Sequence, residues 1–86
     1  MKRIIVLHHT GSDGTNLKVA RRIARKMLGA QKLGICVLVD FEDVKNISAD
    51  FLTILVSCAV TDKARFCGLP IREQHFVISL QKKGNS

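Results

Sequence analysis

A continuous apolar run, Ile35–Val39, constrains the fold of this chain more than any other feature. The run has the length of a strand and contains no polar residue, which is typical of a central strand covered on both faces of a parallel sheet. It stops at Asp40, and a polar loop leads from there to Ser48, a favourable N-cap residue. A helix is therefore expected from Ala49 to about Phe66. A strand, a loop and a helix in this order indicate an α/β protein.

The segment before this run predicts a strand, a loop and a helix. Residues 2–7 are rich in β-branched side chains, and residues 10–14 are rich in turn-forming ones. Thr15 or Asn16 can then cap a helix that ends before the apolar run. The apolar residues of this helix recur at helical spacing and form one stripe: Leu17, Ala20, Ile23, Ala24, Met27 and Leu28.

A third strand is predicted over residues 75–80, after a turn at residues 68–70. The resulting order, βαβαβ, predicts right-handed crossovers and a small α/β fold with a largely parallel sheet of three to four strands packed with two helices. A chain of 86 residues has room for one hydrophobic core. We therefore expect a single domain over residues 1–80 and a flexible tail over residues 81–86.

Composition and spacing disfavour several classes of protein. The apolar runs are far shorter than the roughly 20 residues that span a bilayer, so no membrane-spanning helix is expected. The three cysteines have no C-x-x-C spacing, which fits buried free thiols in a reducing cytoplasm. His8 and His9 point to opposite faces of the predicted strand and cannot both bind one metal ion with Asp40. No catalytic constellation is apparent, so we expect neither an enzyme nor a cofactor.

The residues around the end of the apolar run resemble a known family. Residues 37–52, Val-Leu-Val-Asp-Phe-Glu-Asp-Val-Lys-Asn-Ile-Ser-Ala-Asp-Phe-Leu, are similar to the core of STAS domains, most closely a small STAS-like family of unknown function. The resemblance implies a non-catalytic regulatory module of the prokaryotic cytoplasm that binds a protein partner. In anti-sigma-factor antagonists with this fold, a kinase phosphorylates a serine at the start of the equivalent helix and thereby breaks the complex. Aligned from Asp40, that position is Asp50, and Ser48 lies upstream as an alternative acceptor.

Asp50 has two interpretations. As an acid in a first turn, it complements the positive end of the helix. As the counterpart of a phosphorylated serine, it predicts partner binding that no kinase controls. With Phe51 and Leu55 facing inward, Val56 and Val60 form an outward apolar strip, which commonly marks a partner site or a homodimer interface. The expected partner-binding residues are Asp40, Ser48, Asp50, Phe51, Val56 and Val60.

A cationic face is predicted on the first long helix, in a chain of net charge +7. Its basic residues recur opposite the apolar stripe: Lys18, Arg21, Arg22, Arg25 and Lys26. A solvated surface is one interpretation, and an acidic protein partner is another. Nucleic acid is the third, and it predicts binding that weakens steeply with salt.

The loop before this helix is a candidate site for a phosphate or nucleotide ligand. Ligands of α/β proteins bind at the carboxyl ends of strands, where a helix N-terminus offers free amide groups. The alternative is a plain connecting loop. The candidate residues are Thr10, Gly11, Ser12, Gly14 and Thr15.

Overall fold

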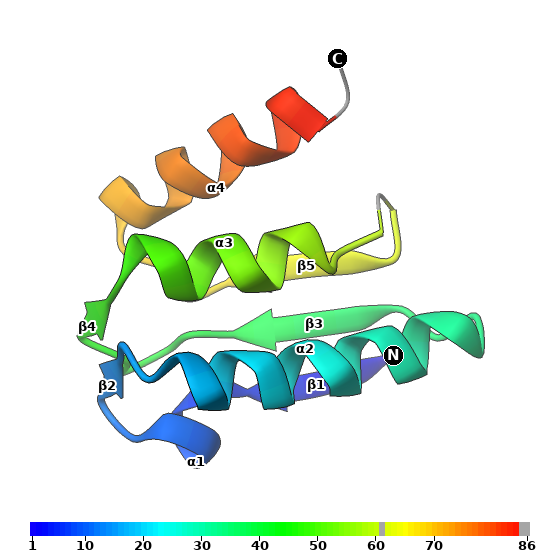
Figure 1. Cartoon of the computed structure of the whole chain (residues 1–86), viewed down its shortest axis with the longest axis horizontal. Coiled ribbons are helices and arrows are strands. Elements are labelled where there is room, and N and C mark those ends of the chain that lie inside the picture. Colours follow the sequence, from blue (N-terminus) through cyan, green and yellow to red (C-terminus); the bar gives the residue numbers. More distant parts are fainter. Residues whose placement is uncertain (61, 85–86) are drawn as a thin grey trace.

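The computed structural model describes residues 1–60 and 62–84, and its main sheet has three parallel strands. In chain order the elements are β1 (Lys2–Ile5), α1 (Val6–Thr10), β2 (Asp13–Gly14), α2 (Leu17–Lys32), β3 (Val37–Asp40), β4 (Asn46–Ile47), α3 (Ala49–Ser57), β5 (Ala64–Cys67) and α4 (Ile71–Gly84). The strand order of the main sheet is β1-β3-β5, and β2 pairs with β4 in a separate two-stranded parallel sheet (Figure 1). The predicted α/β class with a largely parallel sheet is confirmed.

Helices α2 and α3 lie side by side on one face of the main sheet (Figure 1). Along β3, Val37 and Val39 point toward these helices and are 1% and 0% exposed, whereas Leu38 is only half-buried. In the register of the sheet, Leu38 is flanked by two exposed residues, Arg3 of β1 and Arg65 of β5. β3 is the middle strand of the sheet, as predicted, but the expectation that both of its faces are covered is wrong. Because the strands are added in one direction, right-handed crossovers place both helices on the same face.

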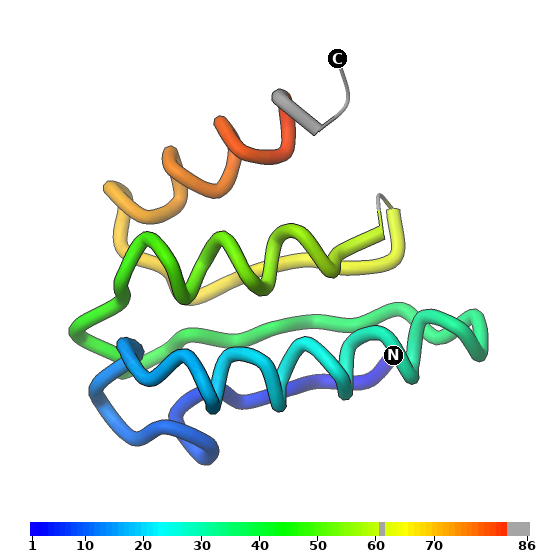
Figure 2. The backbone as a smooth tube through the Cα atoms, viewed as in Figure 1, coloured from blue at the N-terminus to red at the C-terminus, as the bar shows by residue number. Residues whose placement is uncertain are grey.

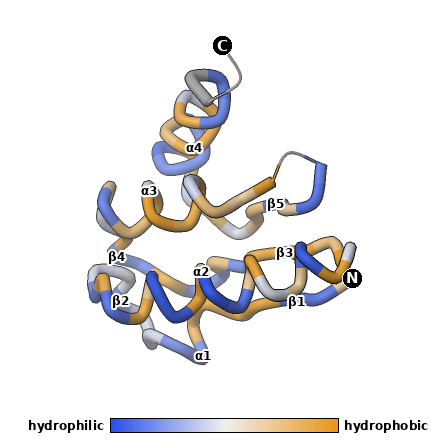
Figure 3. Tube along the Cα trace, turned by 45° about the vertical axis from the view of Figure 1, so that its right-hand side comes forward, coloured by the Kyte–Doolittle hydropathy of each residue, from blue (hydrophilic) through white to orange (hydrophobic). Residues whose placement is uncertain are grey.

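Helix α2 follows the predicted stripe except at Leu28, which is 39% exposed. Figure 3 shows hydrophilic and hydrophobic residues alternating along the helix. The Asn16 side chain caps the helix by accepting a hydrogen bond from the Lys18 amide at 3.0 Å, as one of the two predicted caps. The helix ends at Lys32, with Gly34 beyond it at a φ of 76°, a conformation that favours glycine. The buried residues of α2 are Ala20, Ile23, Ala24, Met27, Ala30 and Gln31.

The first strand is shorter than predicted. β1 ends at Ile5, and Val6 and Leu7 begin α1, which also contains His8 and His9. Val6 is fully buried, and Leu7 packs against the same core. A helical turn can direct two successive side chains toward one core, whereas a strand sends them to opposite faces.

The helix predicted over residues 49–66 is two elements, α3 and β5. Along β5, Ala64 is buried, Arg65 is exposed, and Phe66 and Cys67 are half-buried. The buried side chain of Gln31 accounts for the break, because it donates to the Cys58 carbonyl at 2.9 Å and accepts from the Val60 amide at 2.7 Å. These bonds hold the backbone that leaves α3 in a non-helical path toward the sheet.

Residues 75–80, predicted as the third strand, lie in α4, and β5 takes the place of that strand. Pro70 precedes the helix, and its carbonyl accepts from the Gln74 amide at 2.9 Å. Val77 is buried and packs in the core. The least exposed of the described α4 side chains recur at helical spacing: Glu73, Phe76, Val77 and Leu80.

The predicted tail, residues 81–86, is helical at its start. α4 continues to Gly84, and residues 85–86 lie outside the described residues. Figure 2 shows that α4 starts close to α3 and diverges from the rest of the chain toward its C-terminal end.

The core lies between the sheet and the two crossover helices. Phe41 and Phe51 are both 0% exposed, and their rings meet edge to face with centroids 6.4 Å apart. Phe66 of β5 lies at the same centroid distance from Phe41. In a chain without Trp or Tyr, these rings are the large aromatic contribution to an otherwise aliphatic core.

Candidate functional site

The loops that follow β1 and β3 are joined by the pairing of β2 with β4. Asp13 pairs with Asn46 and Gly14 with Ile47, and the Ser48 amide donates to the Gly14 carbonyl at 3.1 Å. A β-carbon on Gly14 would lie only 3.0 Å from the Asn46 carbonyl oxygen, which explains a glycine here. The bridge places the start of α2 beside the start of α3.

The phosphate-loop candidates lie between Thr10, the last residue of α1, and Thr15, just before α2, and their polar groups bond within this segment. Thr10 Oγ1 donates to the Asp13 carbonyl at 2.6 Å, and Thr15 Oγ1 donates to the Asp13 carboxylate at 3.1 Å. The Lys18 amide is bonded to the Asn16 side chain. A phosphate would have to displace these bonds and approach an exposed carboxylate. Gly11 and Ser12 are exposed, whereas Gly14 is buried in the bridge.

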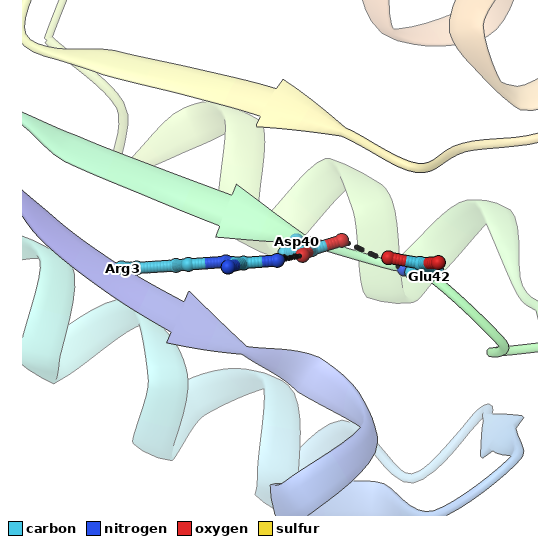
Figure 4. A network of polar contacts seen from close by, with 3 residues as sticks. All are labelled: Arg3, Asp40 and Glu42. Carbon is cyan, nitrogen blue, oxygen red and sulfur yellow. Dashed lines mark hydrogen bonds and ion pairs between the residues drawn. The ribbon is translucent and has the colours of Figure 1, made fainter.

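Asp40, a predicted partner-binding residue, is 3% exposed at the end of β3. Its Oδ2 accepts from Arg3 of β1, through Nε at 3.1 Å and through Nη2. Its Oδ1 accepts from the Glu42 backbone amide at 2.9 Å. Figure 4 shows this network on the face of the sheet opposite the helices. The carboxylate thus ties β1 to β3 and to the following loop rather than facing a partner.

These contacts shift pKa values in the network. The hydrogen bond from Arg3, followed by that from the Glu42 amide, lowers the pKa of Asp40 despite the opposing effect of burial. The bond to Asp40 raises the pKa of Arg3. Cys67 of β5 is in register with Asp40, and burial first and the Asp40 charge second raise the pKa of its thiol. A thiol that stays protonated lacks the nucleophilic thiolate of reactive cysteines.

The first turn of α3 carries three further predicted contact residues. Ser48 Oγ accepts from the Phe51 amide at 3.1 Å, so Ser48 is the N-cap, as predicted. Asp50 is exposed in the first turn and complements the positive end of the helix. Phe51 is a core residue and has no exposed surface for a partner. The exposed surface of this turn is therefore contributed by Ala49 and Asp50, beside a half-buried Ser48.

A concave surface of about 510 Å³ adjoins this turn, between α3 and α4. It is lined by Ile47, Ala49, Leu52, Arg72, Glu73, His75, Phe76 and Ser79. More than half of these residues come from α4 and were not predicted as site residues. The signal that reveals them in the sequence is the helical spacing of Glu73, Phe76 and Leu80, which a strand would not produce.

A larger groove of about 990 Å³ lies between α3, β5 and α4. Val56 and Val60, predicted contact residues, line it together with Phe66, Val77 and Ile78. Val60 is 47% exposed and Ile78 is 49% exposed, so large apolar side chains remain uncovered here. Of the predicted partner residues, Val56 and Val60 thus line the larger groove, and none is among the residues that line the smaller one.

The predicted anion-binding residues all lie exposed on α2: Lys18, Arg21, Arg22, Arg25 and Lys26. The ion pair found within the described residues joins Arg3 to Asp40, so none of these five side chains is neutralised there. His9 of α1 lies near the same face, where burial first and the charge of Lys26 second lower its pKa. This surface concentrates positive charge.

Other chemistry-bearing side chains are scattered. Within residues 1–60 and 62–84, no three His, Cys, Asp or Glu side chains lie close enough together to hold a metal ion. Cys36 is exposed, so the expectation of a buried thiol is wrong there, because β3 begins only at Val37. Cys58 and Cys67 are half-buried. No helix in the described part of the chain is long and apolar enough to cross a membrane.

Neither a family model, nor a curated protein, nor a solved structure matches this chain. Three surfaces of the described residues are candidate sites: the first turn of α3 with the smaller groove, the larger groove along β5, and the cationic face of α2.

Proposed function

We propose that this chain is a non-catalytic, STAS-like regulatory module that binds a protein partner at the first turn of α3. The observation that carries the proposal is exposed Asp50 in the first turn of α3, where the adjacent residue Ala49 lines the smaller groove. That groove combines half-buried apolar side chains, Ile47 and Phe76, with the exposed polar side chains of Arg72 and His75. An apolar centre with a polar rim is the usual composition of a protein interface.

The resemblance of residues 37–52 to STAS domains supports the same surface, because phosphorylation at the start of this helix breaks the partner complex in antagonists of that group. An acid at position 50 has no hydroxyl to phosphorylate. Partner binding at Asp50 is therefore constitutive in this proposal. The outer faces of α2 and α3 extend the surface, since the β2–β4 bridge holds the starts of the two helices together.

Affinity capture with matched variants tests this proposal. The wild-type chain, Asp50→Lys and Glu42→Lys serve as baits in lysate of the source cell. Glu42→Lys makes the same charge change at an exposed side chain after β3, where only the backbone amide is bonded. A partner at the α3 turn is retained by the wild type and by Glu42→Lys, and binds Asp50→Lys about tenfold more weakly in calorimetry with the purified proteins.

Folding must be unaffected for that result to count. Removing a first-turn acid is expected to lower the free energy of unfolding by less than about 1 kcal/mol. If every captured protein binds Asp50→Lys as tightly as the wild type, the assigned interface is wrong.

We propose nucleic-acid binding as a second candidate function, because the cations of α2 are exposed and unneutralised among the described residues. Labelled DNA or RNA is titrated at low and at moderate salt. Tight binding that weakens steeply with salt, and that Arg21→Glu with Arg25→Glu abolishes, supports this function. An absence of binding at low salt eliminates it. The same titration with an acidic protein separates nucleic acid from an acidic partner.

A third proposal is a phosphate or nucleotide ligand at the loop of Thr10–Thr15. A thermal-shift screen with inorganic phosphate and nucleotides tests it, since a bound ligand raises the melting temperature. A flat screen retires this proposal.

A further inference from the structure

β5 is an edge strand with one row of backbone groups facing away from the sheet. The Val37 amide donates to the Lys63 carbonyl at 2.7 Å, and the Phe41 amide donates to the Cys67 carbonyl at 2.8 Å. Residues 63 and 67 therefore face β3, and by the alternation of a strand the amide and carbonyl groups of Ala64 and Phe66 face outward. Within the described residues, no strand pairs with this outer edge. Such an edge is a template for another extended chain.

The larger groove lies along the same edge. Its lining includes β5, the outer side of α3 and the α4 residues Val77 and Ile78. A segment in this groove would contact β5 on one side and α4 on the other. The apolar side chains that remain uncovered, Val60 and Ile78, would be buried by it. The groove and the free edge thus favour the same kind of occupant, an extended chain with apolar side chains on one face.

The opposite face of this edge is basic. Arg65 lies on the uncovered face of the sheet in register with Leu38, and Lys63 lies in the turn directly before β5. Both side chains are exposed, and neither has an acidic partner among the described residues. A second copy of this chain paired antiparallel through β5 would place Arg65 opposite Arg65 or Lys63 in two of the three registers that match outward-facing residues. Like charges directly opposite each other are destabilising.

We propose that the outer edge of β5 binds an extended segment of a partner protein whose residues alternate between apolar and acidic. The segment adds a fourth strand to the sheet. Its apolar side chains enter the groove between α3 and α4, and its acidic side chains pair with Arg65 and Lys63 on the other face. This surface is distinct from the first turn of α3, so either assignment can fail without the other.

The test uses a blocked peptide of alternating valine and glutamate, about seven residues long so that it spans an edge strand. A valine and lysine peptide of the same length is its matched control. We expect saturable binding of the glutamate peptide alone by fluorescence anisotropy. Arg65→Glu with Lys63→Glu should weaken it at least about tenfold, because two attractive cross-strand pairs become repulsive. Lys32→Glu, an exposed charge change on α2, should leave it within about twofold.

Backbone pairing is tested on the peptide, so the fold of the protein is untouched. N-methylation of the valine amides removes donors from one edge of the peptide, and N-methylation of the glutamate amides removes them from the other. One of the two methylated peptides should lose binding, and its identity reports the direction of the added strand. Equal binding of both methylated peptides, or of the lysine peptide, overturns the proposal. A dimer of the free chain that excludes the peptide assigns the edge to a second copy and also overturns it.

Discussion

Gly68 provides the sharpest test of how closely the end of β5 packs against the loop after β3. The residue has a φ of 74°, in the region that favours glycine. A β-carbon there would lie 2.6 Å from the Glu42 amide nitrogen and 2.8 Å from Oδ1 of Asp40. These are the two groups that bond to each other at 2.9 Å. Gly68→Ala must therefore strain the backbone and also disturb the Asp40 network.

The two costs can be separated with Gly34→Ala. Gly34 has a φ of 76°, but a β-carbon there meets nothing within 4 Å. We expect Gly34→Ala to lower the free energy of unfolding by about 1–2 kcal/mol, because a residue with a side chain is strained in the left-handed conformation. Gly68→Ala adds an overlap with backbone, which costs a further ~1–3 kcal/mol, for a total of about 2–5 kcal/mol. The difference between the variants measures the close approach alone, because loss of unfolded-state freedom is the same for both.

The measurement is urea unfolding followed by far-ultraviolet circular dichroism, since the chain has no Trp or Tyr to report by fluorescence. An unchanged m-value in both variants assigns the shift in midpoint to stability. If Gly68→Ala is no less stable than Gly34→Ala, β5 does not approach the Glu42 amide as described. A total near 5 kcal/mol would be a large share of the stability of a small domain, so the experiment begins at low urea.

Three further predictions concern α2 and α1. Gln31→Leu should lower the free energy of unfolding by about 2–4 kcal/mol, because it leaves the Cys58 carbonyl and the Val60 amide without their partner. A loss below about 1 kcal/mol in urea unfolding would contradict the role of this side chain. Gly29→Ala should raise the free energy of unfolding by about 0.5–1 kcal/mol, since Gly29 is exposed within α2 and a β-carbon there meets nothing within 4 Å. An unchanged melting temperature would contradict a regular helix at this residue. Because the pKa of His9 is lowered in the folded chain, the unfolded chain binds a proton at this residue first as the pH falls. The free energy of unfolding should therefore decrease below about pH 7, through the unfolded value near 6.5, and His9→Gln should flatten this pH dependence. An unchanged pH dependence would show that His9 is not its source.

Local signals in the sequence predict the parts of this fold that depend on them. The stripe of α2, its Asn16 cap and the Ser48 cap of α3 follow from spacing and residue type alone, and the structure confirms them apart from Leu28 of the stripe. The end of α3 does not follow, because it depends on Gln31, which is distant in the sequence but buried against the helix end. Strand β5 does not follow from the sequence either, because its residues fit a helix equally well. Helix α4 does not follow because residues 75–80 form an apolar run that also fits a strand.

The candidate sites show the same division. Exposure of Asp50 and of the cations on α2 follows from helix periodicity. The engagement of Asp40 with Arg3 does not, because it requires the register of two parallel strands that are far apart in the sequence. The grooves could not be anticipated either, since both depend on the position of α4.

The bridge between β2 and β4 has a consequence for motion. The Ser48 amide donates its hydrogen bond to Gly14, so it can exchange with deuterium only when the two loops separate. Its exchange rate therefore measures how often the pairing of β2 with β4 opens. Gly14→Ala should accelerate the exchange, because the added β-carbon crowds the Asn46 carbonyl. A ligand that displaces either loop would therefore shift the first residues of both α2 and α3. The pairing of β2 with β4 thus couples the motions of the two helix starts, although they lie more than thirty residues apart in the chain.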